Sequence, residues 1–135
     1  MKRPGWNKYF KDIILLTAKR STCKKHNVGC VLVINNRIIS QGYNGHVSGA
    51  KHEQKLREGK ELATIHAEQN VIADCAKRGV NCEGATAYIT HYPCVHCMKL
   101  LCASGIKYIK YINKHKYDPL VKYFAKCSGI KITKI

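Results

Sequence analysis

The order of apolar and polar positions along the chain predicts a helix followed by a β-hairpin. Apolar side chains recur at helical spacing over Trp6–Lys19, which is typical of an amphipathic helix. The β-branched run Val28–Ile34, the turn-forming pair Asn35-Asn36 and the segment Arg37–Gln41 predict two antiparallel strands. The segment Gly42–Gly45 is expected to stop the second strand.

The rest of the chain predicts helices that alternate with strands. Residues 47–63 are polar and highly charged, so they are expected to form an exposed loop with at most one short helical turn. The later elements are predicted at Thr64–Arg78 (helix), Thr86–Thr90 (strand), Pro93–Ser104 (helix), Lys107–Ile112 (strand), Pro119–Lys126 (helix) and Ile130–Ile135 (strand). Pro93 suits the first helical position, where the N–H that it lacks would have no partner. This order predicts an α/β fold in which helices cover both faces of a mixed sheet.

Length and composition predict one domain. A chain of 135 residues has room for one hydrophobic core and contains no linker-like or repeated segment, so residues 1–135 are expected to form a single domain. The longest apolar runs are too short to cross a bilayer. No apolar stretch typical of a signal peptide follows the N-terminal residues Met1–Trp6. We therefore expect a cytoplasmic protein with no membrane partner.

The chain is strongly basic, with 24 lysines and arginines, 8 acidic residues and a formal net charge of +16. Such a charge favours anionic partners, namely nucleotides, phosphate or nucleic acid. The basic residues are spread along the whole chain, however, and a dispersed excess indicates a polynucleotide-binding surface less strongly than a stripe would. The sequence therefore favours a small anionic ligand over nucleic acid.

The eight cysteines are predicted to be reduced, because secreted disulfide scaffolds are usually loop-rich and carry signal peptides. Two of them, Cys94 and Cys97, have the spacing of metal ligands. Three others, Cys30, Cys75 and Cys102, fall on apolar stripes and are predicted to be core residues.

Two short motifs, His66-Ala67-Glu68 and Pro93–Cys97, carry the candidate chemistry. Cys94 and Cys97 lie three positions apart at a predicted helix start, so both sulfurs project from one side of its first turn. The partial positive charge of a helix N-terminus favours the thiolate forms that zinc requires. His66, also at a helix start, adds an imidazole nitrogen. Three protein ligands leave the fourth tetrahedral position open, which is typical of a catalytic zinc ion.

Glu68 is predicted to be the general acid and base rather than a fourth ligand. Zinc lowers the pKa of bound water from about 15.7 to roughly 7, which makes hydroxide available at neutral pH. The two motifs resemble the signature of zinc deaminases, which implies that this hydroxide attacks C4 of a cytosine ring. Glu68 would carry the water's proton to N3 and a second proton to the departing amine, which leaves a uracil ring and ammonia. The alternative is a structural zinc site with Glu68 on the surface. The complete His-x-Glu and Pro-Cys-x-x-Cys pattern, a signature of zinc deaminases, favours catalysis.

Two further histidines lie close to these motifs in the sequence. His96 lies between the two cysteines, and a helix would turn it away from the metal. His91 precedes Tyr92-Pro93 and is a candidate to border the pocket without ligating the metal.

With these residues in place, the chain resembles the deoxycytidylate (dCMP) deaminases of the cytidine deaminase superfamily, close to the bacterial late-competence type. The similar segments are Trp6–Phe10, Arg20–Cys23, Val28-Gly29, Arg37–Ile39, Gly42–Gly45, Thr64–Asn70, Gly84-Ala85, Tyr88–Cys94, Ser104–Ile106 and Ser128–Ile130. Asn70 and the Gly42–Gly45 turn are the features that indicate a deoxynucleotide. The resemblance implies a three-layer α/β/α cytidine deaminase-like fold with a five-stranded mixed sheet. It also implies hydrolysis of dCMP to dUMP and ammonia, which supplies dUMP for thymidylate synthesis.

The same resemblance implies roles for residues around the substrate. Asn44 is similar to the family asparagine that contacts the sugar, and the backbone of Ala67 and the segment around Thr90 would hold the edge of the base. The candidates for the phosphate contact cluster just before the first strand and are Arg20, Lys24, Lys25 and Asn27.

One departure concerns a second, structural zinc ion, which many relatives bind through the cysteine of Arg20–Cys23 and further Cys or His residues. Cys23 and His52 are present, but residues 53–65 contain no Cys or His. One catalytic zinc ion is therefore expected, and a complete second site is not. The resemblance also implies a homo-oligomer, commonly a hexamer, and regulation by dCTP and dTTP.

Three alternatives to dCMP deamination stay open at this point. The first is deamination of dCTP, alone or together with dCMP. The second is a tRNA adenosine deaminase, which shares the fold and the zinc motif and would explain the net charge of +16. The third is a non-catalytic zinc module that binds nucleic acid through its basic surface.

Overall fold

The centre of the fold is a five-stranded sheet with the strand order β2-β1-β7-β8-β9. The computed structural model describes residues 1–114 and 116–135. The strands are β1 (Gly29–Ile34), β2 (Arg37–Tyr43), β7 (Thr86–His91), β8 (Tyr108–Asn113) and β9 (Lys131–Lys134). β1 runs antiparallel to both β2 and β7, whereas β7, β8 and β9 run parallel to one another. The predicted mixed sheet is therefore confirmed.

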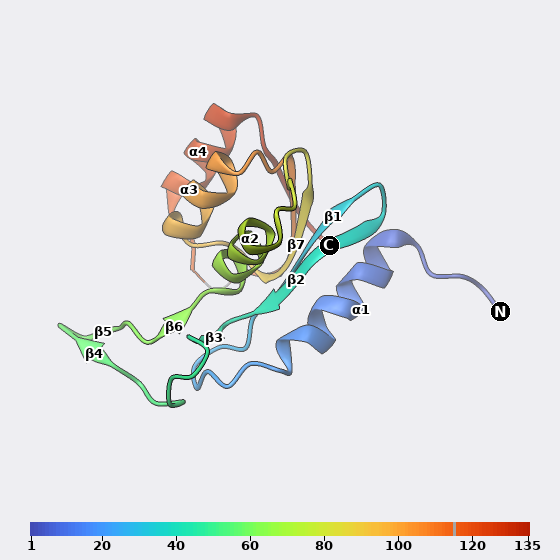
Figure 1. Cartoon of the computed structure of the whole chain (residues 1–135). Coiled ribbons are helices and arrows are strands. Elements are labelled where there is room, and N and C mark those ends of the chain that lie inside the picture. The colour runs from blue at the N-terminus through green and yellow to red at the C-terminus, as the bar shows by residue number, and fades with distance from the viewer. Residues whose placement is uncertain (115) are drawn as a thin grey trace.

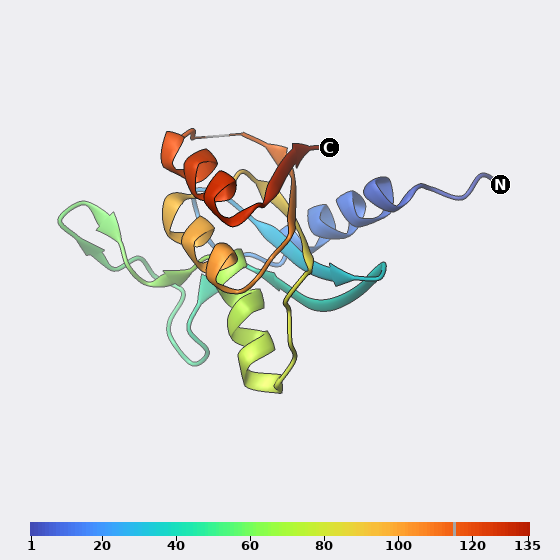
Figure 2. The same cartoon turned by 90° about the horizontal axis from the view of Figure 1, so that it is seen from above.

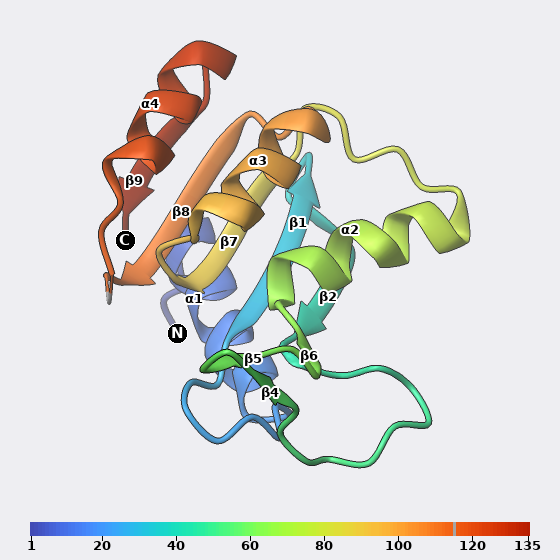
Figure 3. The ribbon, with the colours of Figure 1, turned by 90° about the vertical axis from the view of Figure 1, so that its left-hand side faces the viewer.

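Helices cover both faces of this sheet, which confirms the predicted three-layer α/β/α arrangement (Figures 1 and 3). Helix α1 (Trp6–Ala18) lies alone on one face, against β1 and β7. Helices α2 (Ala67–Arg78), α3 (Val95–Ala103) and α4 (Pro119–Ser128) lie on the other face. Parallel neighbours need a crossover connection, and α3 and α4 supply the two crossovers from β7 to β8 and from β8 to β9.

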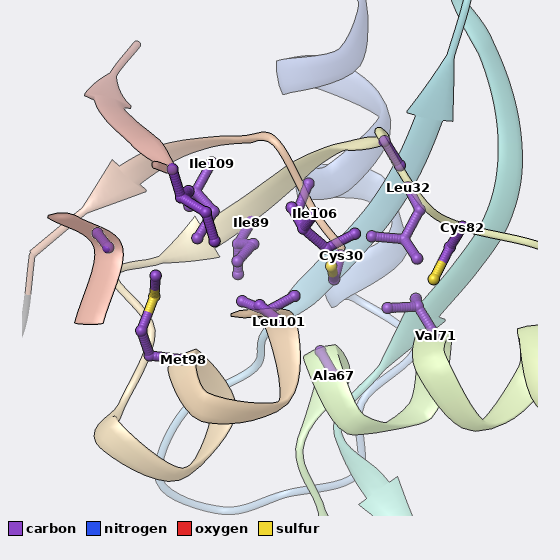
Figure 4. Packing of buried hydrophobic residues seen from close by; sticks show 14 of the residues in the cluster. Cys30, Leu32, Ala67, Val71, Cys82, Ile89, Met98, Leu101, Ile106 and Ile109 are labelled. Carbon is purple, nitrogen blue, oxygen red and sulfur yellow. The ribbon is translucent and has the colours of Figure 1, made fainter. Parts of the chain in front are cut away.

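Alternate side chains of the strands fill two separate cores, one on each face of the sheet. Val31 and Val33 of β1 pack with Phe10 and Ile14 of α1. The residues of β1 next to them face the other way, into a larger core that includes Cys30, Leu32, Val71, Ile89, Met98, Leu101 and Ile109 (Figure 4). Full burial of one such aliphatic side chain stabilises a fold by roughly 1.5–3 kcal/mol. The larger core therefore holds α2 and α3 against one face of the sheet, and the smaller core holds α1 against the other.

The cysteines predicted to be core residues are found there. Cys30 and Cys75 are buried in the larger core, and Cys102 is partly buried against it. All eight cysteines are free thiols. Within residues 1–114 and 116–135, no helix has both the length and the apolar character that a bilayer crossing requires.

Residues 47–63 are largely exposed, as predicted, but their regular structure is a small hairpin and not a helical turn. Strands β4 (Leu56–Arg57) and β5 (Lys60–Glu61) are joined by Glu58 and Gly59, which both adopt positive φ angles. The hairpin projects from the body of the molecule (Figure 2). Two-residue strands are too short to produce a periodic pattern, so the sequence gives no signal for them.

The carboxylate of Glu61 holds both ends of this hairpin. It accepts hydrogen bonds from the backbone nitrogens of Lys55, Ala63 and Thr64 and from the Thr64 hydroxyl, over 2.8–3.2 Å. The backbone hydrogen bonds from Lys55 and Ala63 lower the pKa of Glu61 to about 2. The hairpin is therefore fixed to the strand that leads into α2.

Two predicted boundaries move because of local pairing. Thr64–Ile65 forms β6, which pairs with β3 (Gly45–His46), so α2 begins at Ala67 and not at Thr64. β2 extends two residues beyond the predicted Gln41, since Gly42 pairs with Cys30 in the sheet, and it ends at Tyr43, within the segment Gly42–Gly45 that was expected to stop it. A Cβ atom at position 42 would lie 3.2 Å from the side chain of Val71, which explains why a glycine suits this strand position.

Candidate metal centre and active site

The N-termini of α2 and α3 meet at the candidate metal site. His66 is the N-cap of α2 and Cys94 is the N-cap of α3, and both have extended backbone conformations. Helix α3 consequently begins at Val95, and Pro93 lies before it rather than at the predicted first helical position. The sulfur of Cys94 accepts a hydrogen bond over 3.4 Å from the backbone nitrogen of Cys97, as the side chain of an N-cap residue commonly does.

Three possible ligand atoms come together here from separate parts of the sequence. Nδ1 of His66 lies 3.1 Å from the sulfur of Cys97 and 3.7 Å from the sulfur of Cys94. All three atoms lie within 4.8 Å of one another. One imidazole and two cysteines are a donor set found at catalytic zinc ions, so the residues present fit the predicted metal. In the described part of the chain, no other His, Cys, Asp or Glu side chains gather in such a group of three.

The side chains of His66, Cys94 and Cys97 are linked by hydrogen bonds, so that neighbouring groups share a proton. The hydrogen bond between the two thiols lowers the pKa of Cys94 to about 3 and raises the pKa of Cys97. The hydrogen bond with Cys94 raises the pKa of His66. A divalent cation at the centre would replace these shared protons, because it binds the thiolate forms and a neutral imidazole.

Glu68 lies in the first turn of α2, two residues after His66. The residue is only 5% exposed, and burial raises the pKa of its carboxyl group. Together with His66 and Cys94 it lines one pocket. A carboxyl group that is buried beside a candidate metal site has the surroundings that a general acid and base requires.

The pocket has a volume of about 600 Å³. Small-molecule sites commonly measure roughly 300–1,000 Å³, so this one is large enough for a nucleotide. Three exposed lysines line it, Lys24, Lys25 and Lys116. Two acidic lining residues are engaged elsewhere, since Glu53 pairs with Lys55 and Glu61 binds the backbone. Three glutamates in the described lining, Glu53, Glu61 and Glu68, balance the formal charge of these lysines, so the exposed ammonium groups rather than a net positive lining are what an anionic ligand can bind.

The residues predicted to bind the substrate fall into two groups. Those that line the pocket are Lys24, Lys25, Asn44 and Ala67. Those outside its described lining are Arg20, Asn27 and Thr90. The guanidinium of Arg20 lies instead over the ring of Tyr43, 5.8 Å from its centroid.

Asn44 and Thr90 are both held by hydrogen bonds near the start of β1. The side chain of Asn44 accepts a hydrogen bond from the backbone nitrogen of Val28 over 2.8 Å and donates one to the carbonyl of His26 over 2.7 Å. The buried hydroxyl of Thr90 accepts a hydrogen bond from the first backbone nitrogen of β1 and lies 2.9 Å from Nδ1 of His91. His91 itself lines the pocket, as predicted, so Thr90 contacts a lining residue.

Sequence reasoning missed several lining residues. Lys116 is brought to the pocket because β8 lies beside β7, and no local motif marks it. His46 and His52 also line the pocket, with ring centroids 5.1 Å apart. His96 is exposed and does not line the pocket, in agreement with its predicted orientation away from the metal.

Known proteins are similar to this chain in sequence and fold. Residues 4–113 match the family model described as the cytidine and deoxycytidylate deaminase zinc-binding region. The chain belongs to this deaminase family. ComE operon protein 2 of Bacillus subtilis is 39% identical to the deaminase over an alignment that covers 100% of this chain and 74% of that protein. The deoxycytidylate deaminase of Mycobacterium phage D29 is 32% identical, and the alignment covers 82% of this chain and 97% of that enzyme.

The deaminase also resembles a solved structure over the full length of both chains. The dCMP deaminase of cyanophage S-TIM5, solved in complex with dCMP and dUMP, aligns with a TM-score of 0.88 and 27% identity, and the alignment covers 100% of each chain. The predicted relationship to the deoxycytidylate deaminases and the predicted cytidine deaminase-like fold are therefore confirmed.

Proposed function

We propose that this deaminase hydrolyses dCMP to dUMP and ammonia. The observation that carries the proposal is the convergence of three possible zinc ligands with a buried Glu68 beside a pocket that three lysines line. The solved relative with bound dCMP and dUMP supports a nucleoside monophosphate as the ligand. Lysine is a frequent partner of phosphate, so the lysines are complementary to that part of dCMP.

His66, Cys94 and Cys97 would hold the zinc ion. When bound, the ion supplies Lewis-acid chemistry that activates a water molecule at neutral pH. Glu68 would accept a proton from the attacking water at a carboxylate oxygen and deliver it to N3 of the cytosine ring. The same carboxyl group would then carry the remaining proton of that water, from the new hydroxyl group on C4, to the departing amino group, so that ammonia leaves and the ring becomes uracil. Because Glu68 is buried, its surroundings limit proton exchange with bulk water.

Residues around the pocket would orient the nucleotide. The backbone of Ala67, between His66 and Glu68, would bind the edge of the base, and Asn44 would bind the sugar. For the phosphate we assign Lys24 and Lys25, and we add Lys116. Thr90 would contribute to base binding by positioning His91, which lines the pocket. Arg20 and Asn27 would contribute to phosphate binding from outside the described lining.

We further infer that residues 1–135 act as one cytoplasmic deaminase domain. Eight free thiols support a reducing compartment. The family resemblance supports a homo-oligomer, such as a hexamer, and regulation by dCTP and dTTP. Light scattering tests the number of subunits, and turnover of dCMP with each triphosphate added tests the regulation.

A substrate panel tests the proposed activity. The purified protein is incubated with dCMP, dCTP, cytidine and a tRNA stem-loop, and the release of ammonia is measured. We expect the highest kcat/KM for dCMP. Turnover of cytidine as fast as that of dCMP would contradict phosphate recognition, and ammonia release from the stem-loop alone would replace the proposal with the RNA-editing alternative.

A further inference from the structure

A second hollow shares Tyr92 with the active-site pocket and is lined by residues from the ends of β7 and β8 and from α4 and β9. Figure 3 shows how these elements are arranged. Its volume is about 400 Å³. Its polar lining consists of Tyr92, Tyr111, Tyr117, Lys114, Lys122 and Lys126, above aliphatic side chains of α4 and the adjoining β9 segment. We refer to this hollow as the tyrosine groove.

The aromatic rings of the tyrosine groove cluster around one ammonium group. The ring centroids of Tyr92 and Tyr111 lie 5.0 Å apart with an interplanar angle of 82°, and those of Tyr92 and Tyr117 lie 6.2 Å apart. Nζ of Lys114 lies 4.2 Å from the centroid of Tyr117 and 5.3 Å from that of Tyr92. Ring faces and a cationic side chain are therefore available at the same place.

The described lining of the tyrosine groove has a net positive charge. Three lysines contribute to that lining, and none of its described residues is acidic. Tyr92 lines both the groove and the active-site pocket, whose own lining includes Lys24, Lys25 and Lys116. The two hollows therefore adjoin at Tyr92, and lysines line both of them.

We propose that the tyrosine groove binds single-stranded nucleic acid, with a base stacked on a tyrosine ring and the neighbouring phosphates paired with the lysines. Channels for single strands combine these two features, because every base has a face that can stack and every nucleotide carries a phosphate. An exposed cation–π contact is weaker than base stacking, so a base can displace the ammonium of Lys114 from the ring of Tyr117. The flexible lysine side chain then reaches the phosphate. This binding goes beyond the proposed deamination and is no step of it.

The sequence did not predict this site because its residues do not form a basic stripe in the chain. Tyr92 follows β7, Tyr111 lies in β8, and Lys122 and Lys126 lie in α4. Only the parallel arrangement of β7, β8 and β9 brings them together. The dispersed positive charge of the sequence is therefore gathered locally by the fold.

The test is fluorescence anisotropy with a labelled oligothymidylate of about 12 nucleotides, within the range of site sizes known for such channels. Thymine has no exocyclic amino group, so binding is measured independently of deamination. We expect Tyr117→Ala to weaken binding by roughly tenfold and Tyr117→Phe, which keeps the ring, to preserve it. Tyr117 is 51% exposed, so both variants should fold, and thermal melting checks this.

Two matched charge variants separate the groove from the overall charge. The groove variant replaces Lys114, Lys122 and Lys126 by glutamate. The control variant replaces three other exposed lysines, Lys2, Lys77 and Lys107, also by glutamate. Both change the net charge equally. We expect the groove variant to lose roughly tenfold or more in affinity and the control variant to lose much less. Turnover of dCMP should remain unchanged in both variants, so a failure of the binding proposal can be distinguished from a failure of the proposed enzymatic function.

Several outcomes would overturn the proposal. One is the absence of oligonucleotide binding, and another is an equal loss of affinity in the two charge variants. A third is binding of a duplex as tight as that of the single strand, because stacking needs exposed bases. A fourth is binding of dTMP as tight as that of the oligonucleotide, which would make the groove a mononucleotide site.

Discussion

Nδ1 of His66 lies 3.1 Å from the sulfur of Cys97, although 31 positions separate the two residues in the sequence. The contact exists because α2 and α3 begin beside each other on one face of the sheet, where the larger core holds both helices. The possible metal ligands are therefore positioned by hydrophobic packing around them.

The first prediction concerns removal of the metal. We expect chelation to abolish deamination while the helical circular dichroism signal persists, because the two cores include residues far from the ligands. Small zinc domains that lack such cores unfold without metal. Addition of zinc should restore turnover. Collapse of the dichroism signal on chelation would contradict this explanation of how the site is held.

A pair of cysteine variants supports the same test. Cys97→Ser should lose bound zinc and activity, whereas Cys127→Ser, at an exposed thiol outside the site, should keep both. Metal content by atomic absorption distinguishes the two variants. Equal zinc content in both would show that Cys97 is not a ligand.

The second prediction concerns the contact between α1 and β1. A Cβ atom at Gly29 would overlap the carbonyl oxygen of Ile14 and lie 2.8 Å from the backbone nitrogen of Ala18. Gly29→Ala must therefore move α1 away from the sheet, and overpacking of this kind typically costs about 1–3 kcal/mol of unfolding free energy. Urea denaturation measures the loss.

Gly45→Ala is the matched control for this variant. Its Cβ atom would meet no atom outside its chain neighbours closer than 3.7 Å, so stability should be nearly unchanged. Equal stability of the Gly29→Ala and Gly45→Ala variants would contradict the described packing of α1.

The third prediction concerns the dependence of stability on pH. Hydrogen bonds from Arg78, and then from Ser40, lower the pKa of Asp74. The contribution of the Asp74 carboxylate is therefore fully present above the pKa of an unfolded aspartate, about 3.9, and is lost as the pH falls through the lower folded value. Because Asp74 and Arg78 are partly exposed, we expect Asp74→Asn to cost only about 0.5–1 kcal/mol at neutral pH.

Urea denaturation of the wild type and Asp74→Asn at several pH values checks this prediction. The difference in unfolding free energy should be constant from neutral pH down to about pH 4 and should shrink below it. A difference that persists unchanged at pH 2–3 would show that the charge of Asp74 contributes nothing.

Much of the fold could be predicted from the sequence, because the spacing of apolar residues in a long segment indicates its secondary structure and its buried face. Val28–Ile34 forms β1 from Gly29 onward, and the predicted helix Trp6–Lys19 forms α1 as far as Ala18. The group of possible metal ligands could be predicted because His66, Cys94 and Cys97 lie in a spacing that few other sites require.

The errors arise where local hydrogen bonds compete with the apolar pattern. Cys94 caps α3 with its sulfur and shifts the helix start from Pro93 to Val95. Thr64 pairs with His46 in a short strand ladder instead of joining α2. Such contacts depend on the partner strand or on the side chain of one residue, and neither changes the periodicity.

The lysines that line the pocket could be predicted only in part. Lys24 and Lys25 were found because they precede β1, but Lys116 follows β8 and reaches the pocket through the order of the strands. The tyrosine groove was missed for the same reason. Sequence patterns reveal functional residues that lie close together in the chain. Sites that combine distant residues depend on the strand order of the sheet and are not visible in the sequence.

The final prediction concerns Glu68→Gln, a variant that keeps the size of the side chain and removes the carboxylate that carries protons. The decisive measurement is ammonia release from dCMP by this variant and by the wild type, each with its zinc content determined. We expect equal zinc content and a turnover lowered by roughly a hundredfold or more. Turnover within a few-fold of the wild type, with zinc fully bound, would contradict the role of Glu68 and with it the proposed mechanism.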